Sequence, residues 1–212
     1  MTIFELAQYK EKTFKNLTAP AAAVDEIQFQ DCTFENCRLG EALFNRCSFK
    51  DCMFIDCDLS LAKFPRTRFK KTHFEKCRLV GVNWCDADWE QSSLLKAGRV
   101  DFDACLLNHT LFLGLDLSEV SFKDCQMHGA DFEGADLSHA DFRGADLAGA
   151  RFVNCDLSEA NFVGARDYQI NASHNTLHQT CFSLPEALAL LHSLDIILKD
   201  QALTETYTTK QH

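Results

Sequence analysis

Large apolar side chains recur every five residues through most of the chain. One run extends from Phe29 to Leu94 and a second from Phe102 to Phe162, and neither run misses a member. A five-residue step scatters such residues around a helix, and on a flat strand it places them alternately on the two faces. They can share one interior only if the backbone turns a corner every few residues. The pattern therefore predicts a coil.

The two runs are out of phase by three residues, so the segment LKAGRVD (95–101) must hold an insertion, with a small bulge or loop at Gly98. Residues 18–24 also depart from the pattern, and residues 1–28 are expected to form an N-terminal cap or an irregular first coil. The first repeat run then occupies 29–94. The second run with its final coil occupies 102–182.

A small residue lies two positions before each large one, mostly Ala in the second half and often Cys in the first. Nine of the 11 cysteines occupy this position, and only Cys85 and Cys181 do not. Buried Cys behaves as a small hydrophobe, so these thiols are predicted to be inert filling of the interior. The nine are Cys32, Cys37, Cys47, Cys52, Cys57, Cys77, Cys105, Cys125 and Cys155.

Metal binding and disulfide bonding are weaker interpretations of the same cysteines. The chain has no CxxC pair, and zinc ligands are usually closely spaced. If four pentapeptides make one coil, Cys37, Cys57 and Cys77 stack in one column. Parallel side chains in such a column hold their Cβ atoms further apart than a disulfide prefers. Free thiols in a reducing compartment are therefore expected.

Composition excludes several classes of function. The formal net charge of −10 argues against binding nucleic acid directly. No stretch reaches the roughly 20 apolar residues of a membrane span, and MTIFELAQYKEKTF lacks a signal-peptide core, which predicts a cytoplasmic protein. Catalytic and nucleotide-binding motifs are absent, and the histidines have no metal-ligand spacing. We expect neither an enzyme nor a bound cofactor or metal.

The negative charge belongs almost entirely to the second half. Residues 29–94 hold 10 acidic and 10 basic residues, whereas residues 102–165 hold 11 acidic residues against Lys123, Arg143 and Arg151. Steps of 20 residues stack Asp116, Asp136 and Asp156 on one face, and Asp131, Asp136, Asp141 and Asp146 give one acid to each face of one coil. Either this acidity serves a partner, or Asp is simply the favoured residue before the large apolar one.

Two other segments have a distinctive composition. KFPRTRFKKTHFEKCR (63–78) is strongly basic and is either a nucleic-acid contact or, as we favour, a solvated face, because no aromatic side chain is spare for stacking. Residues 183–200 predict a C-terminal helix and strand. There Ser183, Pro185 and Glu186 form a capping-box pattern, and Leu184, Leu188 and Leu191 share one helix face. Such a helix can cover the end of the coil or form a dimer seam. Residues 201–212 are a tail.

The stretch GADFEGADLSHADFRGADL resembles the pentapeptide-repeat family, in which a small residue, Asp or Asn, and Leu or Phe precede two variable positions. The resemblance covers roughly residues 29–182. It implies an all-β solenoid, a right-handed quadrilateral β-helix with four pentapeptides per coil, here with a C-terminal capping and dimerisation helix. Seven to eight coils at ~4.8 Å each would give a rod of roughly 35 Å.

A narrower resemblance is carried by FSLPEALALLHSLDI, by DYQINASHN (167–175) and by GVNW (81–84). These segments resemble the gyrase-protecting branch of the family, most closely its albicidin-resistance members and more loosely its quinolone- and microcin-resistance members. The resemblance implies a DNA mimic that binds DNA gyrase, and sometimes topoisomerase IV, and protects it from topoisomerase poisons. The alternative is a pentapeptide-repeat scaffold for another cytoplasmic protein.

That resemblance also implies where the protein binds its partners. The homodimer would form through Phe182, Leu184, Leu188, Leu191 and Leu194. The partner-binding acidic surface would comprise Asp116, Asp131, Glu133, Asp136, Asp141, Asp146 and Asp156.

Overall fold

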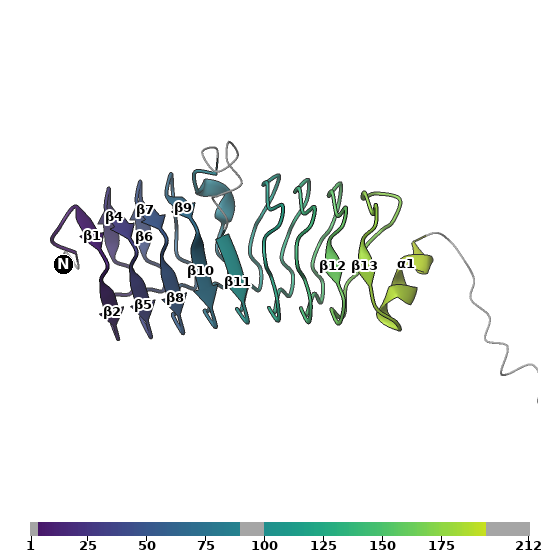
Figure 1. Ribbon diagram of the computed structural model, residues 1–212, viewed down its shortest axis with the longest axis horizontal. Helices are drawn as coiled ribbons and strands as arrows, with labels where there is room; N and C mark the ends of the chain where they lie inside the picture. The colour runs from purple at the N-terminus through teal and green to yellow at the C-terminus, as the bar shows by residue number, and fades with distance from the viewer. Residues whose placement is uncertain (1–3, 90–99, 194–212) are drawn as a thin grey trace, which may run out of the picture.

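The chain winds into a rod with its N-terminus at one end and a short helical segment at the other (Figure 1). The computed structural model describes residues 4–89 and 100–193. Strands in neighbouring turns pair in parallel with partners 20 residues apart, as in Phe29↔Phe49. The molecule is an all-β solenoid of about eight turns, which confirms the predicted fold class.

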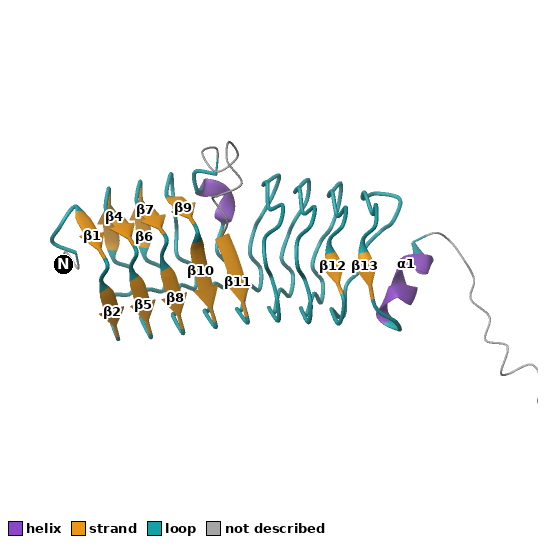
Figure 2. Ribbon diagram, in the orientation of Figure 1, coloured by secondary structure: helices purple, strands orange, loops and turns teal. Residues whose placement is uncertain are grey.

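Two of the four faces carry most of the regular strands (Figure 2). The first, here called the Phe29 face, is a four-stranded parallel sheet of β1 (Gln8–Lys10), β4 (Gln28–Gln30), β7 (Ser48–Lys50) and β9 (Arg68–Lys70). The next, the Phe34 face, is a five-stranded sheet of β2 (Thr13–Lys15), β5 (Thr33–Glu35), β8 (Met53–Ile55), β10 (Thr72–Glu75) and β11 (Val100–Asp103).

The other faces are held by shorter pairings. The Leu39 face is joined by single bridges such as Arg38↔Asp58, and the Phe44 face by the pair β3 (Ala23–Asp25) and β6 (Leu43–Asn45). In the second half most turns are linked by single bridges, apart from the pair β12 (Asn161–Phe162) and β13 (Cys181–Phe182).

The apolar residues of the five-residue period fill the interior, as predicted. Along the Phe34 face, Phe34 stacks on Phe54 with ring centroids 4.5 Å apart, and Phe54 stacks on Phe74 at 4.8 Å. Rings on adjacent faces meet edge to face instead, as Phe49 and Phe54 do. Both arrangements suit the quadrupole of the aromatic ring. The core is therefore a set of ring columns that run along the rod axis.

A left-handed backbone makes the corners between faces. The residue two places after each large apolar one has a positive φ through nearly all described turns, for example 51° at Asp51 and 52° at Asp56. Asp, Asn and Gly enter this region more readily than other residues. At Gly144, with φ of 70°, a Cβ would also clash with Oδ1 of Asp124 in the turn before, so a side chain there requires that neighbour to move.

The first turn is regular, although residues 18–24 were expected to interrupt the repeat. Ala19 and Val24 take the central positions with smaller side chains, and Val24 pairs with Phe44 in the next turn. Phe4 then packs over this end of the rod, against Tyr9 and Phe14.

The insertion between the two repeat runs leaves the core continuous. Phe74 pairs with Phe102, 28 residues on, so this turn is eight residues longer than the others. The two rings still stack at 5.3 Å. Residues 90–99, with Leu94 and Gly98, lie outside the described residues, and Val100 already belongs to β11. The ring column of the Phe34 face therefore continues across the insertion.

The C-terminal segment differs from its prediction. A 3₁₀ helix, η2 (Glu186–Leu188), continues into a single helical turn, α1 (Ala189–His192), in place of a longer helix. The capping box does not form, because the Ser183 hydroxyl accepts a hydrogen bond from the Gly164 backbone N–H of the preceding turn (3.0 Å). Residues 194–200 lie outside the described residues.

Candidate functional site

The Asp of each pentapeptide has a local structural role that the sequence did not reveal. Its side chain accepts a hydrogen bond from the backbone N–H two residues later, at 3.1 Å for Asp116, 2.9 Å for Asp136 and 2.9 Å for Asp156. Such side-chain-to-backbone bonds are typical of Asp and Asn in turns. The recurrence of Asp is thus explained in part by the fold alone.

The seven predicted acidic residues do not form one surface. Asp131, Asp136, Asp141 and Asp146 point from four successive faces of one turn, as the spacing required. On three of these faces the charge is compensated within the molecule. Arg151 bonds Asp131 at 3.0 Å and also Glu133; Arg143 bonds Asp141; Arg166 and His128 contact Asp146 at 2.8 and 2.9 Å.

The remaining three acids form the acidic strip, which we define as Asp116, Asp136 and Asp156. They lie on the Phe29 face, and their backbones bridge from turn to turn in parallel. In the described part of the chain none of the three forms an ion pair with Lys or Arg. The strip is the uncompensated part of the predicted surface.

Three carboxylates of this half have a lowered pKa. The Ser158 hydroxyl and backbone N–H lower the pKa of Asp156, with burial opposing them. Burial alone would raise the pKa of Asp141, but the hydrogen bonds from Arg143 outweigh it and the net pKa is lowered. At Asp146 the hydrogen bonds from His128 and Arg166 outweigh burial in the same way, and its pKa is also lowered. Near neutral pH all three are anions.

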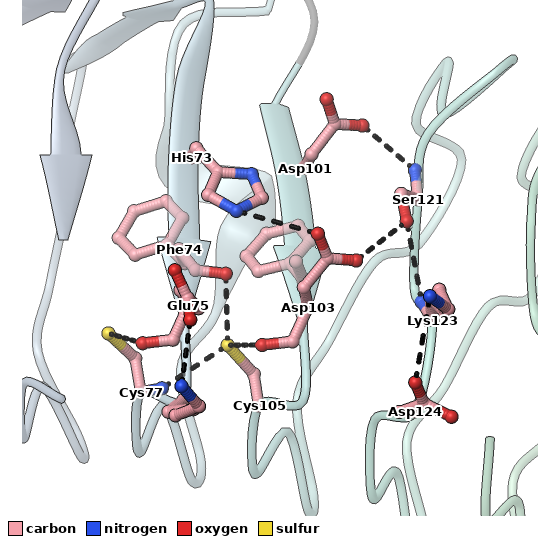
Figure 3. A network of polar contacts seen from close by, with 12 residues as sticks. His73, Phe74, Glu75, Cys77, Asp101, Asp103, Cys105, Ser121, Lys123 and Asp124 are labelled. Carbon is pink, nitrogen blue, oxygen red and sulfur yellow. Dashed lines mark hydrogen bonds and ion pairs between the residues drawn. The ribbon is translucent and has the colours of Figure 1, made fainter. Parts of the chain in front are cut away.

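The junction between the two halves is bonded across the insertion (Figure 3). His73 on β10 contacts Asp103 on β11 at 3.4 Å, and the Ser121 hydroxyl donates to Asp103 at 3.0 Å. The Ser121 backbone N–H donates to Asp101 at 3.0 Å. These contacts tie both acids of β11 to the turns on either side of it.

Nine of the cysteines fill the small position, and they also form hydrogen bonds that the sequence did not predict. All 11 are free thiols. The Cys57 thiol donates to the Phe34 carbonyl at 3.3 Å and accepts the Cys37 backbone N–H at 3.4 Å. Thr67, in the same position, bonds the Phe44 carbonyl in the same way. The occurrence of Thr among the cysteines was the signal for this role.

The buried thiols of this position are not suited to chemistry. Burial raises the pKa of Cys52 to about 12 and that of Cys47 to about 11, which keeps both sulfurs protonated and poorly nucleophilic. Within residues 4–89 and 100–193, no group of three His, Cys, Asp or Glu side chains is placed to hold a metal ion. In the same residues no helix is long and apolar enough to cross a membrane.

The predicted dimerisation residues lie at the C-terminal end of the rod. Phe182 stacks on Phe162 at 5.2 Å and is half-buried. Leu184 is 76% exposed and Leu188 44% exposed, while Leu191 is partly covered. Leu194 lies outside the described residues. An apolar surface is present here, although it is not one continuous helix face.

The geometry of the described residues defines a solenoid of stacked pentapeptides that carries the acidic strip on the Phe29 face. Residues 27–97 and 95–164 match the family model of the pentapeptide repeat region, and the chain belongs to that family. No curated protein sequence matches the chain.

Several solved structures are similar to it. Trypsin-treated QnrB1, a plasmid-mediated fluoroquinolone resistance protein, is 20% identical over 91% of this chain and 90% of its own, with a TM-score of 0.46. HetL is a pentapeptide repeat protein involved in heterocyst differentiation regulation from the cyanobacterium Nostoc sp. strain PCC 7120. It is 21% identical over 82% of this chain and 86% of its own, with a TM-score of 0.44. A pentapeptide repeat protein of the Arabidopsis thaliana thylakoid lumen is 24% identical over 58% of this chain and 56% of its own, with a TM-score of 0.19. These likenesses concern the fold.

Proposed function

We propose that the chain is a DNA-mimicking protein of the cytoplasm. It binds DNA gyrase, and topoisomerase IV with it, and protects them from topoisomerase-poisoning antibiotics such as albicidin or quinolones. The observation that carries the proposal is the acidic strip, an uncompensated column of carboxylates on one face of a rod. The C-terminal and GVNW segments, which resemble the gyrase-protecting branch of the family, support the choice of partner.

The spacing of the strip suits a cationic groove. One carboxylate per turn repeats at about 4.8 Å, against one phosphate per 3.4 Å along each strand of duplex DNA. Lys and Arg side chains that line a DNA-binding groove would meet a similar line of charge. Charge complementarity of this kind raises the association rate and is screened by salt.

Dimerisation would double the strip. Two copies joined at the C-terminal ends, through the apolar surface of Phe182, Leu184 and Leu188, would place their acidic halves next to each other. The strips would then flank the seam, and the protein would present one longer acidic surface to its partner.

A second candidate function is supported by the backbone bonds of the Asp side chains. If Asp116, Asp136 and Asp156 are retained only to bond their turns, the rod is a scaffold for another cytoplasmic protein, and its charge is incidental. The two candidates differ in whether charge at the strip controls binding.

Substitution of the strip by Asn separates the two. Asn retains the oxygen that accepts the backbone N–H, so Asp116→Asn, Asp136→Asn and Asp156→Asn together should keep the fold and remove three charges. The matched control is Asp31→Asn, Asp51→Asn and Asp56→Asn, because Asn also tolerates the left-handed corners at those positions.

Gyrase affinity and protection from a poison are measured for both triple variants across a salt series. We expect the strip variant to lose both together, with the difference from wild type shrinking as salt rises, and the control to change little. Equal effects in the two variants, or none in the strip variant, would leave the scaffold as the better account. A pull-down from bacterial lysate with competing duplex DNA adds a second test, since DNA should displace gyrase from a mimic.

A further inference from the structure

The Phe29 face carries charge of opposite sign towards its two ends. The acidic strip occupies the turns after the insertion. Two adjacent turns before it hold the basic cluster, which we define as Lys50, Arg66, Lys70 and Lys71. Lys50 and Lys70 lie on β7 and β9, and the other two lie at the corners that flank β9. All four side chains are exposed.

Within the described residues, three of the four cations of the cluster have no ion-pair partner, and the fourth has a distant one. Arg66, Lys70 and Lys71 form no ion pair there, and Lys50 is 4.0 Å from its nearest carboxylate, that of Asp51. Neighbouring cations are paired closely by contrast, as Arg68 is with Asp88 at 2.7 Å.

The arrangement also costs stability. Lys50 and Lys70 are direct partners in the parallel register of β7 and β9, so two like charges lie opposite each other on the same face. Like charges in this position are destabilising. An exposed, repelling pair of cations in a chain of net charge −10 indicates a surface that a partner neutralises.

The acidic strip limits what that partner can be. Two turns separate Lys70 from Asp116, which is about 10 Å along the rod and comparable to the Debye length at 0.1 M salt. A nucleic acid lying along the face would meet the strip at that distance and be repelled. A protein groove that is cationic throughout would meet the cluster and be repelled as well. The partner surface must therefore change sign along the rod.

We propose that the basic cluster is a second docking surface, which binds a carboxylate-rich patch beside the cationic groove that receives the acidic strip. The inference rests on the proposed function, because both surfaces belong to one protein partner. Two contacts of opposite sign allow the rod to bind in one direction only. The cluster thus orients each protomer on its partner.

Charge reversal in the cluster should change the affinity for gyrase in opposite directions under this inference and under simple DNA mimicry. Lys50→Glu with Lys70→Glu makes the rod more acidic, so a uniformly cationic groove should bind it as tightly as wild type or more tightly. A carboxylate-rich patch should bind it about tenfold more weakly at 0.1 M salt. The substitution replaces one like-charge pair by another, so the melting temperature should stay close to that of wild type.

The matched control is Lys63→Glu with Arg78→Glu, which changes the net charge by the same amount on the Phe44 and Leu39 faces. Gyrase affinity is measured by calorimetry for wild type and both variants. We expect weakening in the cluster variant and not in the control. Unchanged or tighter binding by the cluster variant would overturn the inference and leave the proposed function in place.

Two other outcomes are informative. If wild type does not bind gyrase, the proposed function fails and the inference fails with it. If wild type binds a 20-base-pair duplex and the cluster variant does not, the cluster is a nucleic-acid contact, and the inference is overturned.

Discussion

The position two residues before each buried Phe or Leu accepts Ala, Cys or Thr, and these residues hold the corner in different ways. Where Ala occupies it, as at Ala42, its backbone N–H closes the turn onto the Leu39 carbonyl at 3.1 Å. Where Cys or Thr occupies it, the side chain adds a hydrogen bond to a backbone carbonyl. Thr67 donates to the Phe44 carbonyl of the turn before and accepts the Cys47 backbone N–H, whereas Thr110 donates to the Leu107 carbonyl of its own turn. The volume of the side chain alone therefore does not explain which residues occur at this position.

Substitutions in one turn test this difference. Cys52→Ala should lower the free energy of unfolding by about 1 kcal/mol, because the thiol bonds to the Phe29 and Lys50 carbonyls at 3.4 and 3.3 Å are lost. Cys52→Thr should restore most of it, since Thr72 follows in the same column. Phe54→Ala should cost about 3–5 kcal/mol through the cavity it leaves. Urea titrations measure all three, and loss of folding in a reducing agent or a chelator would contradict this account.

A second prediction at this scale concerns acid. The folded-state pKa of Asp146 is lowered, so its carboxylate stabilises the fold fully above the unfolded value near 3.9 and less as the pH falls through the lower folded value. Asp146→Asn should therefore destabilise the protein at pH 7 and reduce the loss of stability between pH 5 and pH 2.

The control is Asp167→Asn, at an exposed acid with a left-handed backbone. Unfolding free energies are compared across that pH range. An unchanged pH profile for the Asp146 variant would show that the contacts of Asp146 with Arg166 and His128 contribute nothing to acid stability.

Among the elements, the turns of the coil were predictable from the sequence and the ends were not. A strict five-residue period determines which residues point inward, and Phe74 and Phe102 keep that role across the insertion. The C-terminal segment could not be predicted from its local capping-box motif. The Ser183 hydroxyl bonds the Gly164 backbone N–H of the preceding turn in place of the N-terminus of its own helix. The compensation of Asp131 and Asp141 by arginines, which left only three acids in the strip, also required the packed structure.

The insertion itself gives a prediction at this scale. Deletion of residues 90–97 makes Phe102 the fifth residue after Trp89, with Val100 in the small position, so an uninterrupted coil should result. The shortened chain should keep its circular dichroism spectrum and a cooperative melt near that of wild type, because shortening a connection by a few residues changes its closure entropy only slightly. Deletion of residues 41–48 is the control, and it should abolish cooperative unfolding because it breaks the register of the rings. A similar loss in both deletions would mean that the insertion stabilises the coil.

At the scale of the whole molecule, the exposed apolar end predicts association. Leu184→Glu with Leu188→Glu should convert a dimer to a monomer, and both side chains are exposed enough for the single chain to stay folded. Sedimentation velocity measures the change, and Leu61→Glu, at a leucine 53% exposed on a distant turn, is the control. A soluble double variant that still sediments as a dimer would place the seam elsewhere.

The 20-residue register has a consequence for how this molecule can change in length. Each turn contacts only the turn before and the turn after it, so the rod is a one-dimensional stack whose stability is close to a sum over neighbours. Duplication or loss of one whole turn between Lys70 and Asp116 would move the basic cluster and the acidic strip apart or together by about 4.8 Å and leave both on the same face. Evolution by such steps could match the distance between two charged surfaces to different partners without redesigning either surface.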